Sequence, residues 1–185
     1  SDGGIGAIAI NLRTDYLDLY YAHRDYEQLD VGQIVEAFDG TVKSGKVREI
    51  GASNFTAERL SAALDAAKAN GATPFTMLQN EYNLVSRKAY GPELQRVCTE
   101  RGIGMLPFFG LAAGYLTGKY RRPEDFEQGN RAYRVKDYQE SGRPVLGEMD
   151  RIAAETGASL PAIALAWLVR QPGIAAPIAS ARTTG

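Results

Sequence analysis

An alternation of short apolar runs with longer segments of helical periodicity constrains the fold of this chain more than any other feature. Five runs have the length and composition of buried strands. They occupy residues 17–22, 47–52, 75–79, 103–108 and 175–178. Strands that alternate with helices at this spacing indicate right-handed crossover connections and a parallel sheet. The sequence therefore predicts an α/β fold, and the first run is expected to be buried on both faces.

Capping residues mark where the intervening helices begin and end. Thr56 can begin one helix, and Gly71 lies just beyond its end. Ser159, with Pro161 in the first turn, begins the last helix. Gly45 closes an earlier helix as a left-handed cap. The apolar positions of that earlier helix are expected at 34, 37, 38, 41 and 42.

Two parallel architectures fit this order of elements, an open doubly wound sheet and a closed barrel. An open dinucleotide-binding sheet is expected to carry G-x-G-x-x-G between its first strand and helix, and no such motif follows any of the five runs. A (β/α)8 TIM barrel is therefore preferred. A barrel needs eight strands and typically about 250 residues, so five runs correspond to part of one. A single domain over residues 1–185 is expected.

Composition narrows the class of protein. Hydrophobic residues make up 44% and charged residues 23% with a net charge of −1, so no basic surface indicates nucleic acid or an anionic membrane as a partner. No apolar run approaches the roughly 20 residues that span a bilayer, and no leader pattern opens the chain, so a cytoplasmic location is expected. The single cysteine, Cys98, leaves no internal disulfide or cysteine-based metal site, and its place on the inner face of a helix favours core packing.

The only histidine, His23, directly follows the first apolar run. In parallel α/β architectures the carboxyl ends of strands face the active-site mouth, so a titratable group there is placed for catalysis. A histidine satisfied inside a loop is the alternative. Later in the sequence, residues 120–142 are polar, with charges of both signs and scattered tyrosines. They are expected to form a long surface loop, with Arg131 or Arg134 available for phosphate contact.

Six ordered blocks of sequence together resemble one enzyme family. They are TDYLDLYYAHRD, GKVREIGASNF, LQNEYNLVSR, GLAAGYLTGKY, ALAWLVRQPG and PIASART. The chain is similar in these blocks, from about Thr14 to Arg182, to the aldo-keto reductases, which are NADPH-dependent (β/α)8 barrel enzymes. The resemblance implies a barrel domain that is partial at both ends, beginning just before the family's fourth strand.

The resemblance implies roles for residues at the strand ends. His23 matches the histidine that hydrogen-bonds and orients the substrate carbonyl, where negative charge grows as hydride arrives. Ser53, Asn54 and Gln79 match residues that hold the nicotinamide carboxamide, to which hydroxyl and amide groups are complementary. Phe108 matches the aromatic residue that stacks on the nicotinamide ring, with a core aromatic as the alternative.

A second set of residues matches the family's phosphate contacts. The loop from Gly110 to Gly114 matches the pyrophosphate loop, where small residues let backbone N–H groups approach the phosphate. Lys119 adds a positive charge, although an exposed loop lysine is the alternative. Ser180 and Arg182 match the clamp for the adenosine 2′-phosphate, which favours NADPH over NADH. The implied contacts in this part of the chain are Phe109, Gly110, Leu111, Ala113, Gly114, Leu116, Lys119, Ser180 and Arg182.

Two departures from the family limit what is expected of this sequence. Many relatives have Ser-Pro after the stacking aromatic, where this chain has Phe109 and Gly110, so one hydroxyl contact is lost. The family's catalytic aspartate, acid tyrosine and lysine have no counterpart here, and Asp18, Tyr20 and Tyr21 do not take those roles. Because a proton donor contributes roughly 100-fold to 10,000-fold, the chain alone is not expected to reduce carbonyls.

The resemblance implies an NADP(H)-dependent oxidoreductase that reduces an aldehyde or ketone to an alcohol by hydride transfer. Its expected partner is a small carbonyl substrate, and no oligomeric state is predicted. Two alternatives stay open. One is a non-catalytic nicotinamide-binding regulatory subunit, although His23 argues for the enzyme because an asparagine replaces this histidine in one such group. The other is a truncated, inactive fragment of such an enzyme.

Overall fold

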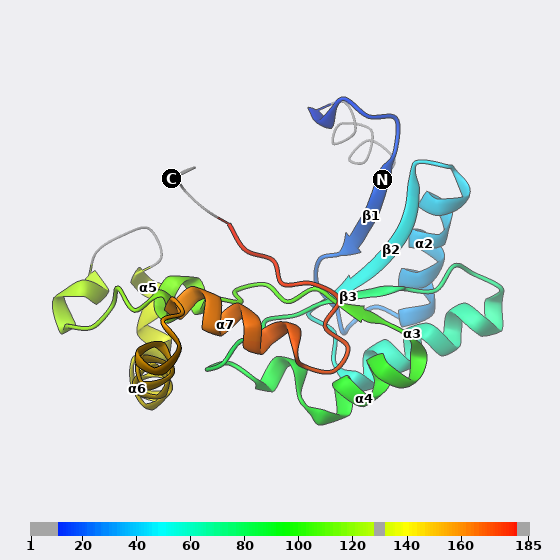
Figure 1. The fold of residues 1–185 in the computed structure, drawn as a ribbon. Coiled ribbons are helices and arrows are strands. Elements are labelled where there is room, and N and C mark those ends of the chain that lie inside the picture. Colours follow the sequence, from blue (N-terminus) through cyan, green and yellow to red (C-terminus); the bar gives the residue numbers. More distant parts are fainter. Residues whose placement is uncertain (1–10, 128–131, 181–185) are drawn as a thin grey trace. The chain divides into compact units, whose positions relative to one another are not determined.

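The computed structural model of the chain describes residues 11–127 and 132–180 (Figure 1). These residues form two compact units. Unit 1 contains residues 11–79 and 92–104, and unit 2 contains residues 80–91 and 105–180.

Unit 1 is organised around parallel strands. In the order in which they are hydrogen-bonded, the strands of the sheet are β1 (Leu17–Ala22), β2 (Val47–Ser53), β3 (Met77–Gln79) and β4 (Gly104–Met105). The pairs β1–β2 and β2–β3 are parallel, and the N–H of Gly104 donates to the carbonyl of Thr76 at 3.1 Å beside β3. A four-stranded parallel sheet connected by helices confirms the predicted fold class, an α/β chain with part of a barrel.

The helices of unit 1 begin and end where the sequence predicts. They are α2 (Val31–Lys43), α3 (Ala57–Asn70) and α4 (Pro92–Arg101). The hydroxyl of Thr56 caps α3 by accepting from the N–H of Arg59 at 3.2 Å, and Gly71 ends it with a φ of 61°. Gly45, with a φ of 73°, follows the end of α2. These positions confirm the predicted caps, since a side-chain oxygen satisfies an N–H that the helix itself cannot.

The core of unit 1 includes one face of α3. Leu60, Ala63, Leu64 and Ala67 form the buried face of this helix, as predicted from their spacing. Phe55 and Phe75 meet edge to face, with ring centroids 5.8 Å apart. Cys98 on α4 is 0% exposed, which confirms its predicted place in the core.

Two expectations for β1 and α2 are wrong. Leu17 and Ala22 are buried, but the side chains between them are exposed or half-buried, because β1 pairs only with β2 among the described residues. On α2 the buried side chains are Val35 and Asp39 rather than those of the predicted apolar stripe. Asp39 is buried because its carboxylate accepts from both the N–H and the hydroxyl of Thr73, at 2.9 and 2.8 Å.

Unit 2 has a different construction, in which helices and turns pack around one apolar cluster. Its helical elements are η1 (Lys88–Tyr90), η2 (Ala112–Thr117), η3 (Pro123–Glu127), α5 (Ala132–Val135), η4 (Lys136–Tyr138), α6 (Gln139–Thr156) and α7 (Leu160–Val169). Ser159 caps α7 by accepting from the N–H of Ala162, as predicted. The cluster draws residues from most of these elements, including Tyr115, Leu116, Leu146 and Met149.

The expectation of a long surface loop at 120–142 is wrong for the residues described. This segment contains η3, α5, η4 and the start of α6. Tyr120, Phe126, Val135 and Tyr138 are at most 8% exposed and belong to the apolar cluster. Their spacing fits neither a long helix nor a strand, so short helical turns bring them onto the cluster instead.

The predicted strand at 175–178 is also wrong, and the one at 103–108 shortens to β4. Ile174 forms an isolated bridge with Met105, and Ala175 and Ile178 donate to the carbonyls of Met105 and Pro107 at 2.9 and 3.3 Å. Pro107 and Pro177 both lack an N–H, so the ladder cannot continue between these segments.

Within the described ranges, no single helix has the length and hydrophobicity to cross a membrane. Residues 136–156 and α7 reach that length and composition only as a pair bent by 102°.

Candidate functional site

Three residues singled out from the sequence lie at the carboxyl ends of neighbouring strands in unit 1. His23 follows β1 directly, Ser53 is the last residue of β2, and Gln79 is the last residue of β3. In the register of the sheet, Ala22 lies opposite Ala52 and Ser53 lies opposite Gln79. Because the strands are parallel, these residues share one edge of the sheet, where ligands bind in such folds.

Asn54 ties these three strand ends together. Its side-chain amide donates to the carbonyl of His23 at 2.9 Å and to the hydroxyl oxygen of Ser53 at 3.1 Å. Its backbone N–H and the Ser53 hydroxyl both donate to the carbonyl of Gln79, at 3.2 and 2.7 Å. Asn54 adopts a φ of 61°, which is uncommon for a residue with a side chain and marks a constrained turn.

This network decides which polar groups can meet a nicotinamide carboxamide. The Ser53 proton and the Asn54 amide are engaged with neighbouring strands, whereas the half-buried side chain of Gln79 has no hydrogen-bond partner among the described residues. A side-chain amide supplies both a donor and an acceptor, which a primary carboxamide requires. The polar groups at this edge therefore fit a nicotinamide carboxamide. Gln79 is available to bind it, and Ser53 and Asn54 hold the strand ends in place.

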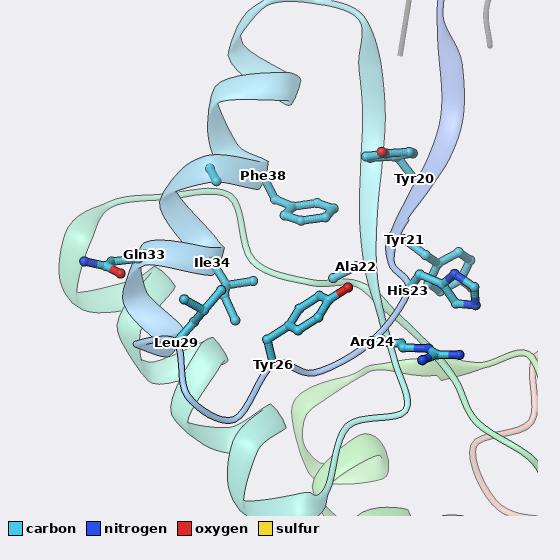
Figure 2. Close-up of a pocket in the computed structure, with 11 residues that line it drawn as sticks. Tyr20, Tyr21, Ala22, His23, Arg24, Tyr26, Leu29, Gln33, Ile34 and Phe38 are labelled. Atoms are coloured by element: carbon cyan, nitrogen blue, oxygen red, sulfur yellow. The ribbon is translucent and has the colours of Figure 1, made fainter. Parts of the chain in front are cut away.

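His23 is exposed, and its imidazole has no hydrogen-bond partner among the described residues. In Figure 2 its ring lies beside Tyr21, on the side of β1 that faces away from Ile34 and Phe38 of α2. This follows from strand geometry, since alternate residues point to opposite faces. Burial raises the pKa of Tyr21 to about 12, and its hydroxyl is buried without a partner in the described part of the chain.

A hollow of about 580 Å³ lies between β1 and α2 (Figure 2). Its α2 side is apolar, and Tyr20 stacks on Phe38 there with ring centroids 5.6 Å apart. The exposed Tyr26 and Leu29 stand at its edge. His23 also lines this hollow, and in Figure 2 its imidazole lies on the side of β1 away from Ile34 and Phe38 of α2.

In unit 2, Phe108 is fixed by backbone bonds beside Glu81. The N–H of Phe108 donates to the carbonyl of Asn80 at 3.1 Å, and Phe108 and Glu81 form a parallel bridge. The Phe108 ring is half-buried and meets the ring of Phe109 edge to face at 5.3 Å. Its partial exposure is consistent with a stacking surface, and this role stays a prediction.

The predicted pyrophosphate loop has an unusual backbone. Phe109, Ala112 and Ala113 have φ values of 54°, 49° and 55°, and Gly114 has 101°. Left-handed conformations cost of order 1–3 kcal/mol each for residues with side chains, and such strain gathers at ligand sites. Successive backbone N–H groups in turns of this kind form concavities that bind anions.

Two glycines of this loop are needed for different reasons. A Cβ on Gly110 would come within 3.0 Å of the Leu168 side chain, so Gly110 allows close packing on α7. Gly114 is favoured by its φ of 101°, and Lys119 lies beside it, with Nζ 3.4 Å from where a Cβ would be. The Lys119 ammonium therefore sits against the left-handed turn, and it also lies 5.0 Å from the centre of the Tyr120 ring.

The neighbouring cations are already paired, which distinguishes Lys119. Arg121 forms a two-pronged pair with Asp150 at 2.7 Å for each contact, and Arg122 pairs with Asp125 at 3.0 Å. Lys119 is exposed and has no carboxylate partner among the described residues. It is the available positive charge beside the strained turn, which fits a phosphate.

Arg134 was expected to be available for phosphate contact, but it is already paired. Its guanidinium bonds to Glu81 at 2.7 Å and lies 5.5 Å from the centre of the Phe109 ring. Tyr138 donates to the other oxygen of Glu81 at 2.5 Å. Burial, followed by this bond to Glu81, raises the pKa of the Tyr138 hydroxyl. Arg131 lies outside the described residues.

The remaining predicted contacts divide by exposure. Ala113 and Leu116 are 5% and 0% exposed within the apolar cluster, so their side chains pack in the core, and the N–H of Leu116 already donates to the carbonyl of Leu111 at 3.2 Å. Leu111 is half-buried and Ser180 is exposed. Arg182 lies outside the described residues.

Sequence reasoning missed a partly buried ion pair two residues from His23. Both guanidinium prongs of Arg59 bond to the carboxylate of Asp25, at 2.8 and 2.7 Å. The two residues are 34 positions apart, and neither lies in a motif whose spacing predicts the other. The Glu81 cluster was missed for the same reason.

The comparisons with known proteins bear on the site as a whole. The family model described as "Aldo/keto reductase family" matches residues 5–185. The chain belongs to this family. An uncharacterized oxidoreductase of Bacillus subtilis, YrpG, is 32% identical over 93% of this chain and 52% of the relative. The NADP(+) aldo-keto reductase yakc of Schizosaccharomyces pombe is 29% identical over 90% of the chain and 49% of the relative.

A further relative is named for its substrate. The L-glyceraldehyde 3-phosphate reductase of Escherichia coli O157:H7 is 29% identical over 90% of this chain and 50% of its own length. The chain thus spans about half the length of the curated relatives it matches. Family membership and reductase-named relatives support an oxidoreductase of the aldo/keto reductase type.

Proposed function

We propose that these residues serve an NADP(H)-dependent oxidoreductase that reduces an aldehyde or ketone to an alcohol. The observation that carries the proposal is the shared strand edge of unit 1, where Asn54 ties His23, Ser53 and Gln79 together. An exposed imidazole and an available carboxamide at one edge of the sheet are the groups that carbonyl orientation and nicotinamide binding require. The NADP(+) named for the relative yakc supports the choice of cofactor.

Each group then has one task. The imidazole of His23 donates an N–H to the carbonyl oxygen of the substrate, where negative charge grows. Gln79 holds the nicotinamide carboxamide, and Phe108 covers the ring. Lys119 and the left-handed turn at Gly114 meet the pyrophosphate, while Ser180 and Arg182 meet the 2′-phosphate. Bound NADPH would supply the hydride.

The proton on the product alcohol needs a donor other than His23. Tyr21 is unsuited, because burial holds its pKa near 12 and its hydroxyl is enclosed. We therefore expect the 185-residue chain alone to bind NADPH without measurable turnover.

Cofactor choice can be tested by titrating NADPH and NADH against Arg182→Ala and following cofactor fluorescence. Losing an arginine fork from a dianion should weaken NADPH binding by about 10-fold or more and leave NADH unchanged. Arg101→Ala, which removes an exposed pair with Asp65 on α3, is the matched control. Equal losses for both cofactors would remove the 2′-phosphate assignment.

The role of His23 can be tested with His23→Asn in the enzyme that contains these residues. Turnover should fall roughly 100-fold to 1,000-fold, because one preorganised donor is lost, while the dissociation constant of NADPH stays the same. Unchanged turnover with weakened cofactor binding would make His23 a cofactor-site or structural residue instead.

A further inference from the structure

The loop that follows His23 is attached to the rest of unit 1 at one buried point. Of residues 23–30, Asp25 alone is not exposed. Its carboxylate side chain is 6% exposed, although the loop around it lies open to solvent. Burying a charged group costs desolvation free energy, so such groups are buried only when they are paired and hydrogen-bonded. The position of the whole loop therefore depends on the partner of Asp25.

That partner is Arg59, which reaches the loop from α3. Nε and Nη2 of Arg59 bond to the two carboxylate oxygens of Asp25 at 2.8 and 2.7 Å, which is the planar fork that only arginine provides. Nη2 also donates to the carbonyl of Leu29 at 3.3 Å. One guanidinium thus holds the loop near its beginning and near its end.

Arg59 is itself fixed in place. Its backbone N–H bonds to the hydroxyl of Thr56, the cap of α3, at 3.2 Å, and its side chain is only 21% exposed. The hydrogen bond to Asp25 raises the pKa of the guanidinium, so the group stays charged. The contacts with Asp25 and with the Leu29 carbonyl therefore both come from a residue on a capped helix, which is more rigid than the loop.

The carbonyl of His23 itself is held by Asn54, whose side-chain amide donates to it at 2.9 Å. Two hydrogen-bonded anchors, one at residue 23 and one at residue 25, leave little freedom for the peptide that carries the imidazole. The imidazole has no hydrogen-bond partner of its own among the described residues. Its orientation depends on these backbone anchors.

We propose that Arg59 is a positioning residue for His23, acting through Asp25 to fix the loop that presents the imidazole. The proposal rests on the proposed function of His23 as the group that orients the carbonyl. A misplacement of about 1 Å at a reacting centre can cost about 100-fold in rate. The fork on Asp25 therefore contributes to turnover without touching substrate or cofactor.

Because His23 is the only histidine, its imidazole gives one unambiguous set of ring NMR signals, here called the His23 signal. Arg59→Lys keeps the charge but loses the fork, and Arg59→Gln loses both. In the 185-residue chain we expect both variants to shift and broaden the His23 signal and to speed amide hydrogen exchange across residues 23–30. Arg101→Lys, which alters the exposed pair between α4 and α3, is the control and should leave both measurements unchanged.

A double-mutant cycle separates positioning from general loss of stability. Asp25→Asn and Arg59→Lys should each speed exchange in the loop, and the double variant should add little beyond either one, because the two residues act as one unit. Unchanged exchange and an unchanged His23 signal in Arg59→Lys, with the fold intact by circular dichroism, would overturn the proposal. So would additive effects of the two substitutions.

Turnover gives an independent readout in the enzyme that contains these residues. Arg59→Lys should lower kcat roughly 10-fold to 100-fold and leave the KM for NADPH unchanged. If His23→Asn is inactive but Arg59→Lys has normal turnover, the positioning role is wrong and the proposed function stands. If Arg59→Lys disturbs the His23 signal but His23→Asn keeps full turnover, the proposed function is wrong and the structural link stands.

Discussion

The two units hold their candidate ligand groups in different ways. In unit 1, ordinary strands place His23, Ser53 and Gln79, and Asn54 ties their ends with hydrogen bonds. In unit 2, the corresponding loop runs through left-handed residues and is stabilised by the apolar cluster beneath it. A hydrogen-bonded site depends on a few polar atoms, whereas a strained site depends on the packing that forces the backbone. Substitutions in the cluster should therefore affect unit 2 more than single polar changes affect unit 1.

The largest effect on stability is expected at Gly142 in α6, which packs directly on Tyr115 of the apolar cluster. A Cβ at this position would lie 2.2 Å from Cε1 of Tyr115, whose buried ring cannot move away. Gly142→Ala should lower the free energy of unfolding by about 3 kcal/mol or more, the upper end of what overpacking costs, because the overlap is with a buried aromatic ring. Gly147→Ala in the same helix, with nothing within 4 Å of its Cβ, should raise it by up to about 1 kcal/mol. Urea denaturation measures both, and equal effects would show that packing on Tyr115 does not hold the cluster.

The next comparison uses one tyrosine from each unit. Tyr138→Phe removes a 2.5 Å hydrogen bond to Glu81 and should destabilise by about 1.5–3 kcal/mol, as expected for a bond to a charged group. Tyr21→Phe removes a buried hydroxyl that has no partner among the described residues and should be neutral or stabilising by up to about 1 kcal/mol. Thermal unfolding of both variants checks the difference in sign. A destabilised Tyr21→Phe would reveal a partner for that hydroxyl beyond the described residues.

The smallest effect concerns acid stability in unit 1. A hydrogen bond from Lys43, followed by the N–H and hydroxyl of Thr73, lowers the pKa of Asp39 to about 2. Because the folded-state pKa lies below the ordinary value of about 3.9, the stabilisation is present above pH 4 and is lost as the pH falls towards 2. Asp39→Asn should be less stable at pH 7 and lose less stability between pH 4 and 2. Parallel stability profiles for the two proteins would contradict the lowered pKa.

The sequence predicts unit 1 more accurately than unit 2, because its elements follow local rules. The bounds of β1 and the caps at Thr56 and Gly71 are correct, since one strand and one capped helix are each encoded by adjacent residues. The failures depend on distant partners. Pro107 and Pro177 interrupt a ladder that each apolar run alone would favour, and the short helices of 120–142 form only on the cluster.

The site shows the same division. Family motifs identify His23, Asn54 and Gln79 by position, but no local pattern shows that Asn54 holds the His23 carbonyl. Asp25 ends one of the family-like blocks, but no local pattern links it to Arg59, and their pairing exists only once the chain has brought α3 beside the loop. Predictions for Phe108, Lys119, Ser180 and Arg182 stay predictions until cofactor binding is measured.

The single cysteine of the chain, Cys98, is fully buried in α4. A thiol reagent can reach it only when α4 opens, so the labelling rate of the unmodified protein reports how often this part of unit 1 separates from its core. When closing is faster than labelling, the ratio of this rate to that of a free thiol gives the opening equilibrium directly. The protein thus contains its own probe of local stability, with no engineered label.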